Sequence, residues 1–466
     1  MRLLEPLYLI ENHDRKRKTT QTKLRLFWYF ISCYWNSHRF KQGRVLQEAG
    51  SAKMALLAWF VGGVLTLSSA MSVAELGSEM PQTGGIYIYI SKIFGKFWGF
   101  LTGWMQISFY GPALIASVSY FFSTLFVTFF KLPTKITFFY FSMRSVVAVS
   151  ILACILIALM NMLENRVSRT FAITTTVIKM IPIFALILFG LFFGKTGATG
   201  SAISVLSEQV DKGNFGVAVL STLFAYDGWV IISNLGGEIK NAQKNLPRAV
   251  TIGIFIVLLA YMGVSFGVFS SLPGKEIVSL GDHAPFHIMQ EAFGSLGGRL
   301  MDIGVMISVI GTLNSKILSF PRVVFEMADH GQLPFSSFFH TLGKKSKTPN
   351  YATAFEILIA ALLLNAFSSS QDLSDWLVFV SFLFYLLTFV AVFILRHQLK
   401  RKPHFAAPLH PLFPILAIAG TLFIEISTIV NALNDSTGEQ LFGITISLLI
   451  VALGIPLYYL RKSYKL

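Results

Sequence analysis

Charged side chains are scarce in this chain. They account for 13% of its 466 residues, whereas 54% of the residues are hydrophobic. A soluble protein of this length carries about a quarter charged residues. The composition therefore excludes a set of soluble domains and indicates an integral membrane protein that crosses the bilayer many times.

Cysteines and the sequence motifs of enzymes are scarce as well. The two cysteines, Cys33 and Cys154, do not form a disulfide framework. Neither an HExxH zinc motif nor a complete Walker A motif occurs. His283 and His287 are four residues apart, but Pro285 separates them, so we expect no metal site. The chain is predicted not to be an enzyme, to bind no cofactor and not to be powered by ATP.

The positive charge is arranged as membrane topology requires. The net charge of +15 lies in short loops and at the termini, so no nucleic-acid partner is expected. Alternate loops and the C-terminus carry 18 lysines and arginines, and the opposite loops carry fewer than half as many. The positive-inside rule then predicts a cytoplasmic C-terminus. Eleven apolar runs are long enough to cross a membrane: 54–75, 97–128, 145–163, 171–193, 215–236, 249–271, 298–320, 351–367, 374–395, 409–431 and 441–460.

One of these runs has a polar, weakened centre. Residues 216–236 have the sequence GVAVLSTLFAYDGWVIISNLG, with Asp227-Gly228 in the middle. A carboxylate at the centre of a spanning helix costs roughly 3 kcal/mol on insertion scales. The adjacent glycine weakens the helix at the same point. A broken, polar-centred span is typical of the midplane substrate sites of secondary transporters.

The first 42 residues do not fit this scheme. The run 54–75 must pass from outside to inside, while the basic residues 15–25 should remain inside, so one further helix must precede residue 54. The only apolar candidate, residues 26–37, is too short to span.

Three long motifs carry a family resemblance. They are AELGSEMPQTGGIYIYISKIFGKFWGFLTGW at 74–104, FAYDGWVIISNLGGEIKNAQKNLPRAV at 224–250 and GTLNSKILSFPRVVFEMADHGQLP at 311–334. Residues 43–466 resemble the L-type amino acid transporter branch of the amino acid–polyamine–organocation superfamily. The resemblance implies an all-α membrane fold of twelve helices in two inverted repeats of five, with helices 1 and 6 unwound at their centres.

The resemblance also defines what is missing. The segment KQGRVLQEAGS at 41–51 matches the end of the family's first-helix motif, with Gln42 in place of proline, but the glycine-rich part is absent. A shifted reading of the codons for residues 33–36 is compatible with the missing Val-Ile-Gly-Thr. The hypothesis is that residues 1–42 are a divergent or frame-shifted form of helix 1, and that residues 43–466 are the transporter domain.

Candidate substrate-binding residues follow from the resemblance. It makes Phe224 the aromatic side chain that closes over the substrate from outside, although lipid contact is the ordinary role of a phenylalanine. It makes Ala225, Tyr226 and Gly228 the unwound stretch that presents backbone polar groups. Asp227 either contacts the substrate or serves only as an acid facing a polar cavity.

Two lysines are coupling and gating candidates. The resemblance puts Lys179 where related folds bind sodium, between helices 1 and 8; the alternative is a side chain that reaches the membrane interface. Lys316 either faces the transport path or reaches the interface in the same way. Asn314 and Ser315 are weaker candidates for the pocket.

The function implied is secondary transport of L-amino acids, by exchange of small neutral ones such as serine and threonine. One alternative is a proton-coupled symporter of the same fold, and another is a non-transporting product without a functional helix 1. The expected partners are the amino acid substrates and the lipid bilayer of the cell membrane. The sequence does not define a partner subunit.

Overall fold

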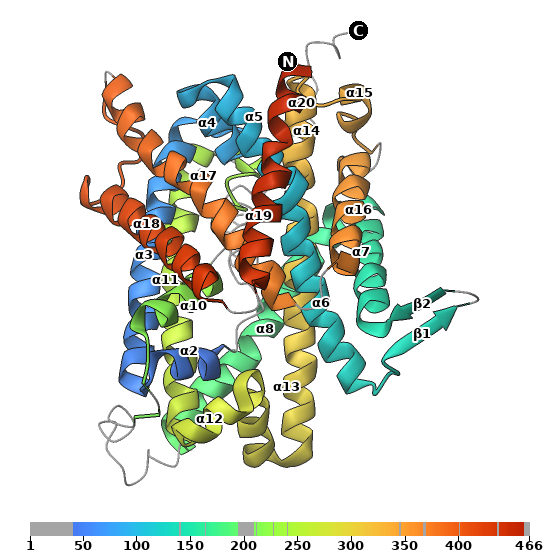
Figure 1. The fold of residues 1–466 in the computed structure, drawn as a ribbon, viewed down its shortest axis with the longest axis vertical. Coiled ribbons are helices and arrows are strands. Elements are labelled where there is room, and N and C mark those ends of the chain that lie inside the picture. The colour runs from blue at the N-terminus through green and yellow to red at the C-terminus, as the bar shows by residue number, and fades with distance from the viewer. Residues whose placement is uncertain are drawn as a thin grey trace, which may run out of the picture.

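The computed structural model describes residues 41–138, 141–163, 165–193, 209–210, 212–226, 228–239, 241–343, 346–366, 370–399, 401–435 and 438–460. The candidate helix at 26–37 and the first 40 residues in general lie outside this part of the chain. The described residues form a helical bundle in which several long helices run close to the vertical direction of Figure 1, while α17 (Ser370–Gln398) and α18 (Leu412–Asn434) cross it obliquely.

The described N-terminal half of the chain contains eight α-helices, one π-helix and one hairpin before the break in the predicted span at 215–236. Its elements are α2 (Gln42–Ala49), α3 (Ala52–Glu79), α4 (Ile86–Phe94), α5 (Lys96–Met105), η2 (Gln106–Tyr110), α6 (Gly111–Phe129), β1 (Lys135–Phe138), β2 (Phe141–Arg144), α7 (Ser145–Leu163), α8 (Asn165–Phe193) and α10 (Phe215–Tyr226). η2 is a π-helical turn inside an otherwise continuous helix from Lys96 to Phe129.

In the C-terminal half, all regular elements of the described residues are helices. Its elements are η3 (Gly236–Glu238), α11 (Ala242–Ser271), α12 (Gly274–Leu280), η4 (Gly281–His283), α13 (Ala284–Ser319), α14 (Pro321–Asp329), α15 (Ser336–Phe339), α16 (Asn350–Ala366), α17 (Ser370–Gln398), α18 (Leu412–Asn434), α19 (Glu439–Ala452) and α20 (Gly454–Leu460). Within α13 the helix is interrupted at Phe293 and Gly294, so the predicted span at 298–320 begins just after this kink.

The predicted all-α membrane class is confirmed. Within the described ranges, nine helices are long and apolar enough to cross a membrane. The predicted run 351–367 forms the shorter α16, and the predicted run 215–236 stops being helical after Tyr226. The twelve-helix count remains an expectation from the resemblance. The two-stranded hairpin β1–β2, which projects sideways from the bundle, was not predicted (Figure 1).

Small and hydroxyl-bearing residues let the helices approach closely. α3 packs against α10, α11 and α18. A Cβ atom on Gly63 of α3 would lie 2.5 Å from the Leu258 side chain of α11. The hydroxyls of Thr66 and Ser72 donate to the carbonyls four residues earlier, so their polar groups are satisfied inside an apolar helix. This composition is typical of helix contacts within a membrane.

Candidate functional site

The helix is broken where the sequence indicated. α10 ends at Tyr226, and Gly228 has φ +122°, a conformation that glycine adopts without steric cost. Residues 229–234 form turns, and Leu235 follows them just before the short η3 helix. Asp227 lies outside the described residues, as does the side chain of Phe224, so the structure tests neither role assigned to them.

The last turn of α10 is held by aromatic residues of α3 and α11. The Tyr226 hydroxyl donates to the backbone carbonyl of Trp59 at 3.0 Å, and the Tyr261 hydroxyl donates to the carbonyl of Ala225 at 3.4 Å. The rings of Trp59, Tyr226 and Tyr261 also pack against one another, with centroids 5.1–5.9 Å apart. The side chain of Tyr226 therefore points into the helix bundle, and only its backbone remains available to line an unwound stretch.

Three other parts of the chain hold the segment after the break. The indole of Trp229 packs on the Tyr385 ring of α17, with centroids 4.9 Å apart. The Ser319 hydroxyl at the end of α13 donates to the Ile231 carbonyl at 2.9 Å. The Gly84 N–H donates to the Asn234 carbonyl at 3.1 Å. The non-helical backbone at 229–235 is thus buried in protein, the condition under which it is tolerated inside a membrane.

The glycines at 84 and 85 have a specific role that the sequence did not reveal. Their φ angles are +98° and +52°, and Thr83 forms an isolated bridge with Leu235. A Cβ atom on Gly85 would lie 2.9 Å from the backbone nitrogen of Asn234. The structure shows that they let their loop contact the segment that follows the helix break.

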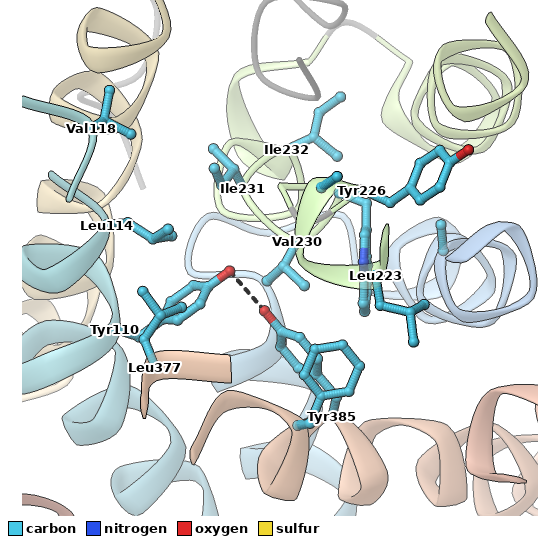
Figure 2. Packing of buried hydrophobic residues seen from close by; sticks show 14 of the residues in the cluster. Tyr110, Leu114, Val118, Leu223, Tyr226, Val230, Ile231, Ile232, Leu377 and Tyr385 are labelled. Atoms are coloured by element: carbon cyan, nitrogen blue, oxygen red, sulfur yellow. Dashed lines mark hydrogen bonds between the residues drawn. The ribbon is translucent and has the colours of Figure 1, made fainter. Parts of the chain in front are cut away.

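A buried pair of tyrosines lies beside this segment. The Tyr385 hydroxyl donates to the Tyr110 hydroxyl at 2.8 Å, and both side chains are buried. Tyr110 ends the π-helical turn η2, and its ring packs edge-on against Phe320. Figure 2 shows this hydrogen bond below Val230 and Ile231, with Tyr226 pointing away from it. No local sequence signal identifies the pair, because its two members are 275 residues apart.

The tyrosine pair gives a testable stability effect. Replacing Tyr385 with phenylalanine should lower the free energy of unfolding by about 1 kcal/mol, since one buried hydrogen bond is lost. Thermal unfolding of the purified protein measures the change. In a double-mutant cycle, Tyr110→Phe and Tyr385→Phe together should cost less than the sum of the single changes. Simple additivity would show that the hydroxyls do not interact.

The two candidate lysines are both buried but lie apart. Lys179 on α8 is 1% exposed and Lys316 on α13 is fully buried. The Asn314 amide contacts Ser168 at 3.5 Å, which sets the register of α13 against α8. Lys179 lies eleven residues beyond Ser168, roughly 16 Å along the helix. The structure therefore brings Asn314 and Lys316 near one end of α8 and leaves Lys179 elsewhere on the same interface.

Two ion pairs connect elements around the broken helix: one joins α3 to α17, and the other joins η3 to α14. Glu75 of α3 is fully buried and accepts hydrogen bonds from Arg396 at 2.5 and 2.7 Å and from the Ala407 N–H at 2.7 Å. Arg322 of α14 is 6% exposed and is paired with Glu238. Burial and the nearby Arg396 guanidinium lower the pKa of His410 from its usual value, so this ring favours its neutral form beside the Glu75 pair.

Comparison with known proteins gives matches over most of the chain. A family profile described as "Amino acid permease" matches residues 40–453. The serine/threonine exchanger SteT of Bacillus subtilis is 39% identical over 426 residues, which cover 91% of this chain and 92% of the relative. The large neutral amino acids transporter small subunit 2 of Mus musculus is 28% identical over 428 residues, 89% of this chain and 76% of the relative. The human cystine/glutamate transporter is 26% identical over 421 residues, 89% of this chain and 79% of the relative.

Proposed function

Because this chain belongs to the amino acid permease family, a group of secondary transporters and not of enzymes, we propose that it exchanges small neutral L-amino acids across the membrane, serine and threonine among them. The exchanger from Bacillus subtilis supports this choice of substrate, since it is similar along nearly its whole length. The observation that carries the proposal is the end of α10 at Tyr226, followed by the left-handed Gly228.

The proposed site uses the polar groups that a broken helix leaves unpaired. The last carbonyls of α10 carry partial negative charge and suit the ammonium group of an amino acid. The N–H groups freed by the break expected in helix 1 carry partial positive charge and suit its carboxylate. The α2 helix lies at the opposite end of α10, where the Asn214 N–H donates to the Glu48 carbonyl, and so it is not part of the proposed site. Ala225, Tyr226, Asp227 and Gly228 form this site in the proposal, and Phe224 closes it from outside.

The two lysines have separate roles in the proposed cycle. Lys179 replaces a coupling cation and holds the inner half of helix 1 closed, while Lys316 faces the transport path. Their burial inside the bundle supports roles within the protein over contact with the membrane interface. The substrate can then shift the equilibrium between the outward-open and inward-open states only through its different affinities for them.

Proton-coupled symport is the alternative of the same fold. In proteoliposomes that contain no internal amino acid, a step in pH should not drive uptake of labelled L-serine by an exchanger. Uptake driven by the pH step under these conditions would overturn exchange in favour of proton symport. Vesicles without protein provide the baseline.

The N-terminal segment remains part of the proposal. We propose that residues 1–42 represent a divergent or frame-shifted helix 1 and that the transporter domain begins at residue 43. The nucleotide sequence upstream of codon 43 is the test: a shifted frame should encode a glycine-rich apolar helix. If the chain lacks a working helix 1, no amino acid will raise its melting temperature in a thermal-shift panel.

The protein is a multi-pass membrane protein, and its C-terminus is proposed to face the cytoplasm. α4, α14 and α15, which belong to the loops rich in lysine and arginine, lie at the same end of the bundle, and α12 lies at the other (Figure 1). This separation supports the assignment of alternate loops to opposite sides. An antibody should bind a C-terminal tag in permeabilised cells but not in intact cells.

A further inference from the structure

A fully buried carboxyl group lies in α16, away from the proposed substrate site. Every fourth residue of this helix, Ala352, Glu356, Ala360 and Leu364, is buried. On the opposite face Leu358 and Leu362 are 61% and 63% exposed, as expected for contact with lipid. Glu356 therefore points into the protein, toward the helices that α16 packs against, chiefly α6 and α7.

The depth of Glu356 follows from contacts at the two ends of α16. Thr348, just before the helix, contacts the carbonyl of Asn161 at the end of α7. Near the other end of α16, Arg144 donates to the carbonyl of Leu364 at 3.5 Å. Glu356 is eight residues from both Thr348 and Leu364, so it lies opposite the middle of α7. The buried residues at that level of α7 are small, with Ala153 and Cys154 at its centre.

The carboxyl group has no partner in the described part of the chain. Neither oxygen of Glu356 accepts a hydrogen bond, and no ion pair involves it. Glu75 shows the contrast, since an arginine and a backbone N–H satisfy its two oxygens. An ionised carboxylate buried without such partners costs several kcal/mol, so the neutral acid is the stable form.

The elements packed on α16 carry titratable and charged residues that could in principle stabilise an ionised Glu356. Neither oxygen of Glu356 accepts a hydrogen bond from any of these residues. The titratable or charged residues of the elements packed on α16 are Tyr120 of α6, Cys154 of α7, Tyr110 of η2, His287, Glu291, Arg299, Asp302 and Lys316 of α13, and Arg322, Glu326 and Asp329 of α14; α15 has none.

We propose that Glu356 is an intramembrane proton-binding site. Its carboxyl group holds a proton while α16 is packed on α6 and α7, and it releases that proton to water only when this contact opens. Protonation therefore favours the conformation described, and the rate of transport depends on pH through this residue. The last point rests on the proposed function, whereas proton binding itself does not.

Infrared spectroscopy of the purified full-length protein tests proton binding directly. A protonated carboxyl group has a C=O stretching band that an ionised one lacks. At neutral pH the wild-type spectrum should contain such a band, and Glu356→Gln should remove one component of it. Gln has the shape of the neutral acid, so the variant should fold. Glu425→Gln is the matched control, because Glu425 of α18 is also buried without a hydrogen-bond partner but packs against other helices.

The control variant should keep the Glu356 component of the band. A wild-type spectrum without any protonated carboxyl band, or a band unchanged by Glu356→Gln, would overturn the proposal. This measurement needs no transport activity, so its failure is distinguishable from a failure of the proposed function.

The pH dependence of exchange tests the second half of the proposal. Across a series from mildly acidic to mildly alkaline buffers, equal on both sides of the vesicle, wild-type serine exchange should change several-fold. Glu356→Gln should remove this dependence, while Glu425→Gln should keep it. A Glu356→Gln variant with the wild-type pH profile would overturn the link between this proton and transport.

Discussion

Arg396→Met is expected to destabilise the protein by about 3–5 kcal/mol, because it leaves the Glu75 carboxylate buried without its counterion. Glu75 is fully buried in α3, and Arg396, which is 22% exposed, binds it through two hydrogen bonds from the end of α17. The pair therefore fastens α3, which follows α2 in the chain, to α17. Thermal unfolding of the purified protein in detergent measures the loss, and exchange activity should fall with it.

The second ion pair of α3 is the control for this experiment. Glu79 binds Arg401, whose side chain is 51% exposed, and it also accepts a hydrogen bond from the His404 N–H and contacts the His404 ring. Arg401→Met should cost no more than about 1 kcal/mol, because Arg401 is exposed and the largely buried Glu79 carboxylate keeps its contacts with His404. Adding Glu75→Gln to Arg396→Met should recover part of the lost stability, since no buried charge then remains. Equal losses for Arg396→Met and Arg401→Met would show that the buried pair has no special role.

Gly85→Ala is expected to reduce exchange activity by about tenfold or more, because a displacement of about 1 Å at a site can cost on the order of a hundredfold. The added Cβ would meet the backbone nitrogen of Asn234 at 2.9 Å and would also meet the side chain of Ser233. The segment after the helix break must then shift. Initial rates of labelled serine exchange in proteoliposomes, normalised to the amount of folded protein, measure the effect.

Gly95→Ala separates this steric effect from backbone strain. Gly95 also has a positive φ, +93°, but a Cβ atom there would meet nothing within 4 Å. Both substitutions carry the conformational cost of about 1–3 kcal/mol that such backbone angles impose on other residues. Only Gly85→Ala should also alter the transport rate per folded molecule. Similar rates for the two variants would mean that the loop does not position residues 229–235.

The sequence predicted those parts of the fold that depend on local patterns. The lengths of the apolar runs correctly predicted nine spanning helices, and Asp227-Gly228 marked the end of α10. Both signals are local, since each lies within one helix or one turn. The same rule overestimated the run at 215–236, since hydropathy does not distinguish helical from non-helical apolar backbone. The hairpin β1–β2 was missed because its aromatic residues appeared as part of a loop.

The contacts that build the site could not be predicted from the sequence. Gly85 meets Asn234, and Tyr110 meets Tyr385, only after the helices have packed, and neither contact leaves a periodic pattern in the chain. The burial of Lys179 and Lys316 likewise depends on how α8 and α13 face each other. The roles of Phe224 and Asp227 still rest on the family resemblance.

Trans-stimulated uptake tests the central claim most directly. Purified protein is reconstituted into vesicles that are either loaded with unlabelled L-threonine or empty, and the entry of labelled L-serine is followed at equal pH on both sides. An exchanger should take up serine much faster into the loaded vesicles than into the empty ones. Equal uptake into both, or uptake no greater than in protein-free vesicles, would contradict the account.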